Sequence, residues 1–162
     1  MLYDEEVIND IKEWLTARKQ TIAVAESVTA GHLQAALSSA VEASKFFQGG
    51  ITAYNVGQKC KHLDVDPIAG LDNDCVTDQI AGTMALNAAR LFISNYSIAI
   101  TGYATKMPEK GLTDLFAWFA IAYEGEIILC EKISTTKERV EAQVDYTRKV
   151  LQKFRDHCMM GK

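Results

Sequence analysis

The segment from Thr21 to Gly31 constrains the fold of this chain more than any other, because an apolar strand there runs through a Glu-Ser-x-Thr-x-Gly turn into a helix. Residues Ile22 to Glu26 have the short apolar pattern of a buried strand, and helical spacing resumes at Ala30. In open α/β sheets, ligands collect outside the carboxyl ends of the strands, where helix N-termini present free N–H groups to anions. The segment therefore predicts an α/β fold with Ser27 as the first candidate nucleophile.

The rest of the chain alternates between helical and strand-like patterns. Amphipathic spacing predicts helices over residues 4–18, 30–40, 77–94 and 136–157, and a short helix capped by Asn55. Apolar runs predict strands over residues 22–26, 46–54, 96–102, 115–123 and 126–133, and turn residues predict a loop over 62–74. Because only Glu124-Gly125 separates the last two strands, they must form an antiparallel hairpin. We expect one domain over residues 1–162, a three-layer α/β/α sandwich with a mixed sheet of about five strands that includes this C-terminal hairpin.

Composition and charge narrow the class of protein. The 162 residues carry a net charge of −4, and the densest basic run, Lys59 to His62, is too short for a nucleic-acid surface. The four cysteines show neither a C-x-x-C pair nor a histidine at zinc-like spacing, which favours reduced thiols and no metal site. The N-terminus is acidic and no apolar run is long enough to span a bilayer, so we expect a cytoplasmic protein that binds neither nucleic acid nor membrane.

A second block of residues gives Ser27 a possible partner. The strand Gly50-Ile51-Thr52-Ala53-Tyr54 is followed five residues later by Lys59. A serine hydroxyl is a poor nucleophile at neutral pH, and a lysine whose pKa is lowered by burial can accept its proton. Backbone N–H groups in the turn after Ser27 could stabilise the oxyanion of a tetrahedral intermediate.

These two blocks, in this order, resemble the C-terminal domain of the competence/damage-inducible CinA proteins, over nearly the whole chain. The family's hallmark Ala-Glu-Ser-Cys-Thr-Gly-Gly stands here as Ala25 to Gly31, and its Gly-x-x-x-Tyr strand with a following lysine stands as Gly50 to Lys59. Stand-alone members are nicotinamide mononucleotide amidohydrolases. The resemblance implies that Ser27 is the nucleophile, Lys59 its base and Tyr54 an assisting residue.

The same resemblance implies a small nucleotide-like substrate, no cofactor, no metal and a homo-oligomer. It also places six residues in the substrate-binding region: Glu26, Thr29, Gly31, Gly50, Thr101 and Gly102.

Other parts of the chain depart from the family pattern. Thr101-Gly102-Tyr103-Ala104 begins the family's glycine-rich loop, but Thr105 and Lys106 replace its glycine and proline, and Ala30 replaces the first hallmark glycine. Side chains at such positions obstruct the close approach of backbone to ligand that glycine permits. The C-terminal segment also lacks the family's arginine arrangement. The cations that could replace the lost phosphate contacts are Lys106, Lys110, Lys137 and Arg139.

Three hypotheses follow: a nicotinamide mononucleotide amidase, an amidase for another small amide, and a non-catalytic paralog that binds a nucleotide or a partner protein. Without the resemblance, Ser27 fits a helix cap better than a nucleophile, and Lys59 fits a solvated helix lysine. Glu26 could orient Lys59 or a ligand, or simply bind backbone N–H groups, and His32 fits a surface or capping residue. Three aromatic residues could stack on a base or pack in the core: Tyr103, Trp118 and Phe119.

Overall fold

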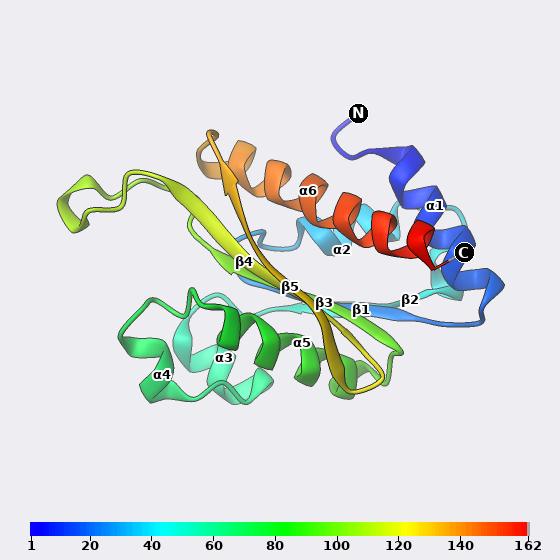
Figure 1. The fold of residues 1–162 in the computed structure, drawn as a ribbon, viewed down its shortest axis with the longest axis horizontal. Coiled ribbons are helices and arrows are strands. Elements are labelled where there is room, and N and C mark those ends of the chain that lie inside the picture. Colours follow the sequence, from blue (N-terminus) through cyan, green and yellow to red (C-terminus); the bar gives the residue numbers. More distant parts are fainter. Residues whose placement is uncertain (162) are drawn as a thin grey trace.

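The computed structural model describes residues 1–161, and its centre is a five-stranded mixed sheet (Figure 1). The strands are β1 (Ile22–Glu26), β2 (Phe47–Thr52), β3 (Tyr96–Gly102), β4 (Leu115–Tyr123) and β5 (Glu126–Thr135). Their order across the sheet is β2-β1-β3-β4-β5. Strands β1, β2 and β3 are parallel, while β4 and β5 form the predicted antiparallel hairpin. The predicted three-layer sandwich with a mixed sheet is confirmed.

Helices cover both faces of the sheet (Figure 1). Helices α1 (Glu5–Ala17), α2 (His32–Ser38) and α6 (Arg139–Met160) lie on one face, and α3 (Val56–Leu63), α4 (Pro67–Leu71) and α5 (Asp78–Phe92) on the other. Two short 3₁₀ turns, η1 (Ala43–Lys45) and η2 (Pro108–Lys110), complete the elements.

The two cores differ in side-chain size because successive strand residues point to opposite faces. Toward α1, α2 and α6 the sheet presents large residues such as Val24, Ile98 and Phe119. Toward α5 it presents alanines, at positions 25, 99, 120 and 122. Small residues on this second face allow α5 to pack closely over the centre of the sheet.

Several element boundaries differ from the predicted ones. Helix α2 starts at His32 because Ala30 and Gly31 adopt positive φ angles of 48° and 102°, which a helix cannot contain. The expected loop over residues 62–74 is wrong in part, since it contains α4, whose N-cap Asp66 accepts a hydrogen bond from the Ile68 amide. Pro67 also suits this start, because its fixed φ is already helical.

The segment between β3 and β4, from Tyr103 to Asp114, projects from the body of the protein and is called the arm below (Figure 1). Its outer part contains η2 and a single bridge between Met107 and Leu112. Its base is fixed to α6, where the Tyr146 hydroxyl donates to the Tyr103 carbonyl at 2.8 Å. The arm leaves the sheet at the carboxyl end of β3, the edge at which β1 also ends.

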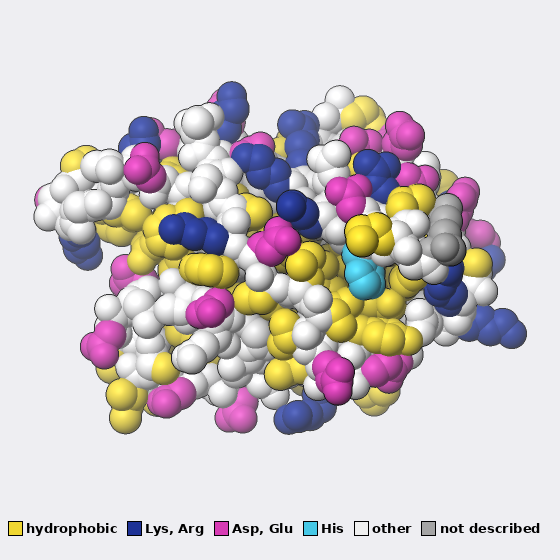
Figure 2. Space-filling view, viewed as in Figure 1, with side chains coloured by type: hydrophobic (Ala, Val, Ile, Leu, Met, Phe, Trp, Pro, Cys, Tyr) yellow, Lys and Arg dark blue, Asp and Glu magenta, His cyan; other side chains and the backbone are white. Residues whose placement is uncertain are grey.

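None of the helices within residues 1–161 has both the length and the apolar character needed to cross a bilayer. On the face shown in Figure 2, lysine and arginine side chains are interspersed with aspartate and glutamate.

Candidate active site

Ser27 lies directly after β1, where its backbone N–H donates to the Ile100 carbonyl of β3 at 3.1 Å. The residue is buried, with 5% of its surface exposed. It does not cap α2, whose N-cap residue is Gly31. The simple capping interpretation of Ser27 is therefore wrong.

Lys59 reaches the same place from α3. Asn55 caps this helix by accepting from the Gln58 amide at 3.0 Å, as the sequence predicted. Lys59 is only 2% exposed, and its Nζ donates to the Tyr54 carbonyl oxygen at 3.0 Å. The interpretation of Lys59 as a solvated surface lysine is wrong as well.

The Tyr54 carbonyl oxygen joins the two predicted catalytic groups. Ser27 Oγ donates to it at 3.5 Å, a long hydrogen bond, and Lys59 Nζ donates to it at 3.0 Å. Two separate blocks of the chain, Ala25 to Gly31 and Gly50 to Lys59, therefore place a hydroxyl and an amine on one acceptor atom.

Burial changes the proton affinity of the Lys59 amine. Loss of hydration lowers the pKa of Lys59 below its usual range, because a charged ammonium is costly away from water. Nearby Cys75 and Cys60 oppose this effect when their thiols ionise. A lysine with a lowered pKa holds more of its neutral form near neutral pH, as a proton acceptor requires.

Tyr54 contributes its backbone rather than its side chain to this arrangement. Its side chain is 64% exposed, in contrast to the buried pair beside it. The structure thus places the ring at the surface next to the site, where the assisting role that the resemblance implies stays a prediction.

Glu26 is a buried carboxylate whose acceptors are occupied by four groups of this chain. It accepts from the Leu33 amide at 2.8 Å, from the Gln34 amide and side-chain Nε2 at 3.0 Å each, and from the Thr29 hydroxyl at 2.5 Å. Glu26 thereby neutralises the positive end of α2. Glu26 and Thr29 hold the turn around Ser27. Of the two predicted roles of Glu26, orienting Lys59 or a ligand and binding backbone N–H groups, the structure shows the second.

The remaining residues predicted to bind substrate meet other parts of the chain. Thr101 is buried and donates to the Cys75 carbonyl at 2.8 Å. A Cβ atom on Gly102 would lie 2.4 Å from the Ala117 Cβ, and one on Gly50 would lie 2.6 Å from Gln34 and Val24 atoms. These two glycines serve close packing, whereas at Gly31 a Cβ would meet open space.

The candidate phosphate-binding cations gather partly at the base of the arm. The Arg139 amide donates to the Ala104 carbonyl, and Lys106 Nζ lies 3.9 Å from a Glu138 carboxylate oxygen. Lys110 lies farther out in η2, and the Lys137 amide donates to Thr135. All four of these candidate cations are exposed.

The aromatic candidates differ in their surroundings. Phe119 is fully buried in the core, which favours the packing interpretation. Tyr103 donates from its hydroxyl to an Asp74 carboxylate oxygen at 3.1 Å and packs edge-on against Phe116. His32 accepts or donates at 2.6 Å with the Tyr3 hydroxyl, as expected of a structural residue.

Sequence reasoning missed the segment from Asn73 to Cys75, which links α4 to α5 and whose Cys75 carbonyl accepts from the Thr101 hydroxyl. The available signal was its Asn-Asp turn chemistry directly before a cysteine, but the cysteines were treated as scattered thiols.

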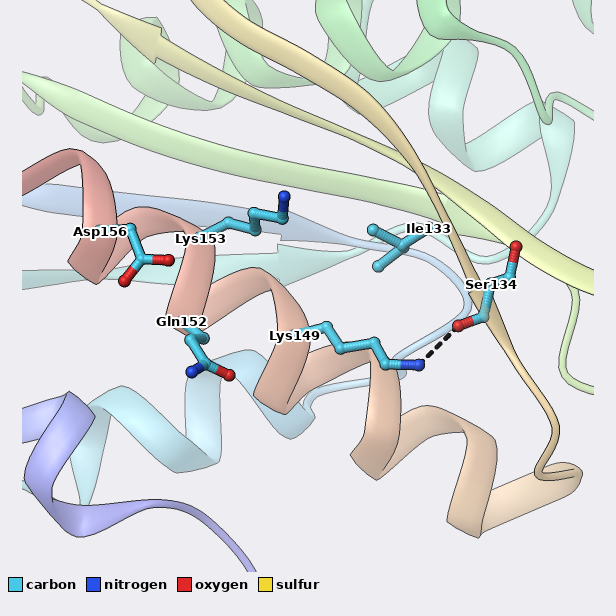
Figure 3. Close-up of a pocket in the computed structure, with 6 residues that line it drawn as sticks. All are labelled: Ile133, Ser134, Lys149, Gln152, Lys153 and Asp156. Atoms are coloured by element: carbon cyan, nitrogen blue, oxygen red, sulfur yellow. Dashed lines mark hydrogen bonds between the residues drawn. The ribbon is translucent and has the colours of Figure 1, made fainter.

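One surface hollow, of about 320 Å³, lies between β5 and α6 and contains none of the predicted site residues (Figure 3). Ile133 lies at its strand side, and Lys149 donates to the Ser134 carbonyl across it. The other lining residues are Gln152, Lys153 and Asp156. This hollow is therefore separate from Ser27 and Lys59.

Comparison with known proteins gives a consistent set of relatives. The family described as the CinA C-terminal domain matches residues 4–158. A CinA-like protein from Chlorobium chlorochromatii is 32% identical over 154 residues, which are 93% of this chain and 35% of that protein. A putative competence-damage inducible protein from Lacticaseibacillus casei is 29% identical over 76% of this chain and 30% of its own length. The chain thus spans about a third of the length of these curated relatives.

Solved structures of similar size share the fold. A CinA superfamily protein from Klebsiella pneumoniae superposes with a TM-score of 0.87 at 25% identity, covering 96% of this chain and 97% of the other. A CinA superfamily protein from Escherichia coli gives a TM-score of 0.83 at 26% identity, covering 93% and 87% of the two chains.

Proposed function

Because this chain belongs to the CinA C-terminal domain family, we propose that it is a serine amidohydrolase in which Lys59 activates Ser27. The observation that carries the proposal is the convergence of Ser27 Oγ and the buried Lys59 amine on the Tyr54 carbonyl oxygen. A solvated lysine or a capping serine would need no such arrangement. An active nucleophile needs a nearby base with a lowered pKa.

The proposed reaction begins when the Ser27 hydroxyl oxygen attacks the carbon of a substrate carboxamide. Lys59 accepts the hydroxyl proton and then donates it to the departing nitrogen, which leaves as ammonia. The acyl group stays on Ser27 as an ester. A water molecule, deprotonated by Lys59, attacks this ester and releases the carboxylate, while the proton returns to Ser27 Oγ.

The oxyanion formed in each attack needs hydrogen-bond donors. The Ser27 amide binds Ile100, and the first amides of α2 bind Glu26, so neither fits this role. We assign the oxyanion instead to the amides of Val28, Thr29 and Gly31 in the turn after Ser27, and not to the Ala30 amide, which donates to the Ser27 carbonyl at 3.1 Å. This assignment differs from a general anion site at the helix N-terminus, because Glu26 already neutralises that end.

We propose the carboxamide of nicotinamide mononucleotide as the substrate. Two exposed cations, Lys106 and Arg139, lie at the base of the arm, at the sheet edge where β3 ends. Their positive charges suit the phosphate of this substrate, so we propose that they bind it. Lys137 and Lys110 are the alternatives. We also propose that the protein is a homo-oligomer, in which a partner subunit would complete the site. Light scattering of the purified protein measures the mass of this assembly.

The test is ammonia release from nicotinamide mononucleotide by the native protein and by Ser27→Ala. We expect release by the native protein and a loss of at least about 10³-fold in Ser27→Ala. If neither protein releases ammonia at high concentration, this substrate is wrong, and glutamine and free nicotinamide test the amidase for another small amide. Lys106→Ala and Lys137→Ala, measured separately, should raise KM for the substrate if they bind its phosphate.

A further inference from the structure

The side chain of Gln34 joins two segments on which the proposed reaction depends. Gln34 is the third residue of α2, and its Nε2 donates to Glu26 Oε2 at 3.0 Å and to Thr52 Oγ1 at 3.1 Å. Glu26 ends β1 and precedes Ser27, while Thr52 ends β2 two residues before Tyr54. One side-chain amide therefore spans the ends of the two strands that lead to the proposed nucleophile and to its acceptor carbonyl.

This contact uses the full donor capacity of the Gln34 side chain. A neutral amide nitrogen carries two hydrogens, one for each of the two acceptors. The backbone amide of Gln34 donates to the same Glu26 oxygen at 3.0 Å, while Glu26 Oε1 accepts from Leu33 and Thr29. Among these hydrogen bonds, the one to Thr52 is the bond that reaches β2.

Strand β2 leaves room for this side chain at Gly50. A Cβ atom there would lie 2.6 Å from Gln34 Cγ and 2.8 Å from Gln34 Cδ, well inside van der Waals contact. Gly50 and Thr52 are two residues apart in β2, so they face the same side of the sheet. The stem of Gln34 therefore lies over Gly50, and its amide binds Thr52.

Gln34 reaches the strand ends from the face of the sheet opposite to Lys59. Helix α2 lies on the face covered by α1 and α6, whereas α3, which carries Lys59, lies on the other face (Figure 1). The influence of Gln34 on the reacting groups therefore runs through the backbone of β1 and β2. There the Ala53 amide donates to the Glu26 carbonyl at 2.9 Å, directly between the two segments.

From these contacts we propose that Gln34 is a positioning residue, which holds the ends of β1 and β2 together and so sets the distance between Ser27 Oγ and the Tyr54 carbonyl oxygen. That hydrogen bond is already 3.5 Å long, so a small separation of the strand ends would break it. Ser27 would then lose the contact that directs its hydroxyl toward the oxygen shared with Lys59. The effect of Gln34 on the rate rests on the function proposed above.

The first measurement is hydrogen exchange at the Ala53 amide, followed by NMR without substrate. Gln34→Met keeps the length of the side chain but removes both donors, and Thr52→Val removes only the acceptor on β2. We expect the Ala53 amide to exchange about three- to tenfold faster in each variant, the range for loss of one or two hydrogen bonds. Gln48→Ala is the matched control, because it shortens an exposed amide side chain on the same strand and should leave this rate unchanged.

The second measurement is ammonia release from nicotinamide mononucleotide by the same variants. Because a positioning residue on the opposite face does not bind substrate, we expect kcat to fall about three- to tenfold in Gln34→Met while KM stays within about twofold. Gln48→Ala should keep both native values.

Unchanged Ala53 exchange in both variants would overturn the proposal, and so would a native kcat in Gln34→Met when the native protein is active. If Gln34→Met does not fold, Thr52→Val decides the matter, since it keeps every bond to Glu26. If the native protein releases no ammonia, the proposed function fails, and the exchange rates alone decide whether Gln34 holds the two strand ends together.

Discussion

Strands β1 and β3 lie side by side in parallel and end at the same edge of the sheet, but the chain continues very differently from each. After β1, a buried carboxylate gathers four donors and folds the chain straight back into α2. After β3, the chain leaves the body as the exposed arm (Figure 1). Ser27, the proposed nucleophile, therefore lies on the side fixed by buried contacts, while the segment that departs from the family pattern lies on the projecting side.

This difference explains how the chain can change residues 105–115 without disturbing Ser27. The position of Ser27 depends on Glu26, Ile100 and the Tyr54 backbone, and none of these contacts involves the outer arm. Under the proposed function, substitutions on the arm would change substrate binding and leave the position of Ser27 unchanged.

Removing the buried carboxylate should have the largest effect on stability. Glu26→Ala leaves the buried Leu33 amide, the partly buried Gln34 amide and the Thr29 hydroxyl without their acceptor, which we expect to cost about 3–5 kcal/mol of the unfolding free energy. Urea unfolding measures this cost. The exposed arm residue Asp114 is the control, because Asp114→Ala should change the unfolding free energy by less than about 0.5 kcal/mol. Equal effects at the two positions would contradict the comparison.

A methyl group at the end of β3 should have the next largest effect. Gly102→Ala places a Cβ atom 2.4 Å from the Ala117 Cβ and 2.8 Å from the Phe116 carbonyl oxygen, for an expected loss of about 2–3 kcal/mol. Gly111→Ala on the arm meets no atom within 4 Å and should cost only the strain of its positive φ, about 1 kcal/mol. Thermal unfolding of both variants checks that Gly102→Ala lowers stability more than Gly111→Ala. The opposite result would mean that Gly111 on the arm is packed more tightly than Gly102 in the sheet.

Lys59→Met should stabilise the protein by about 1–2 kcal/mol at pH 7, because an amine that burial penalises is replaced by an apolar side chain of similar size. The gain depends on pH. Since the pKa of Lys59 is lower in the folded protein, the unfolded chain binds more protons between the folded and the unfolded pKa, and native stability rises with pH over that window. The advantage of Lys59→Met should therefore shrink as the pH approaches about 10. A constant advantage from pH 7 to 10 would show that Lys59 is not penalised by burial.

The smallest expected effect is at the turn before α2. Ala30 adopts a φ of 48° and its side chain is exposed, so Ala30→Gly relieves strain without removing a buried contact. We expect a gain of about 0.5–1 kcal/mol in unfolding free energy, since the relief exceeds the added flexibility of the unfolded chain. Calorimetry of the native protein and the variant measures it, and a loss of stability would mean that the methyl group of Ala30 packs in the folded state.

Much of the fold could be predicted because the periodic patterns are local. Strand β3 was predicted over its full range, and Asn55 and Thr77 cap their helices as their residue types suggest. Helix α4 was missed because its five residues are too few for a helical period to show. The late start of α2 was missed because an alanine at positive φ leaves no trace in a hydrophobic pattern.

The candidate site could be predicted only in part for a related reason. The resemblance points to Ser27 and Lys59 as candidate residues, but a sequence does not show that both groups meet the carbonyl oxygen of Tyr54 while its ring stays exposed. Nor does it show that Thr101 donates to the Cys75 carbonyl, or that Gly102 packs closely against Ala117. Such contacts depend on tertiary packing between distant segments.

The central claim is that Ser27 and Lys59 work as one unit. The most direct measurement is ammonia release from nicotinamide mononucleotide by the native protein, Ser27→Ala, Lys59→Met and the double variant, with folding checked by urea unfolding. A cooperating pair predicts that each single variant loses at least about 10³-fold in kcat and that the double variant loses little more. Full activity in folded Ser27→Ala or Lys59→Met, or losses that simply multiply in the double variant, would contradict it.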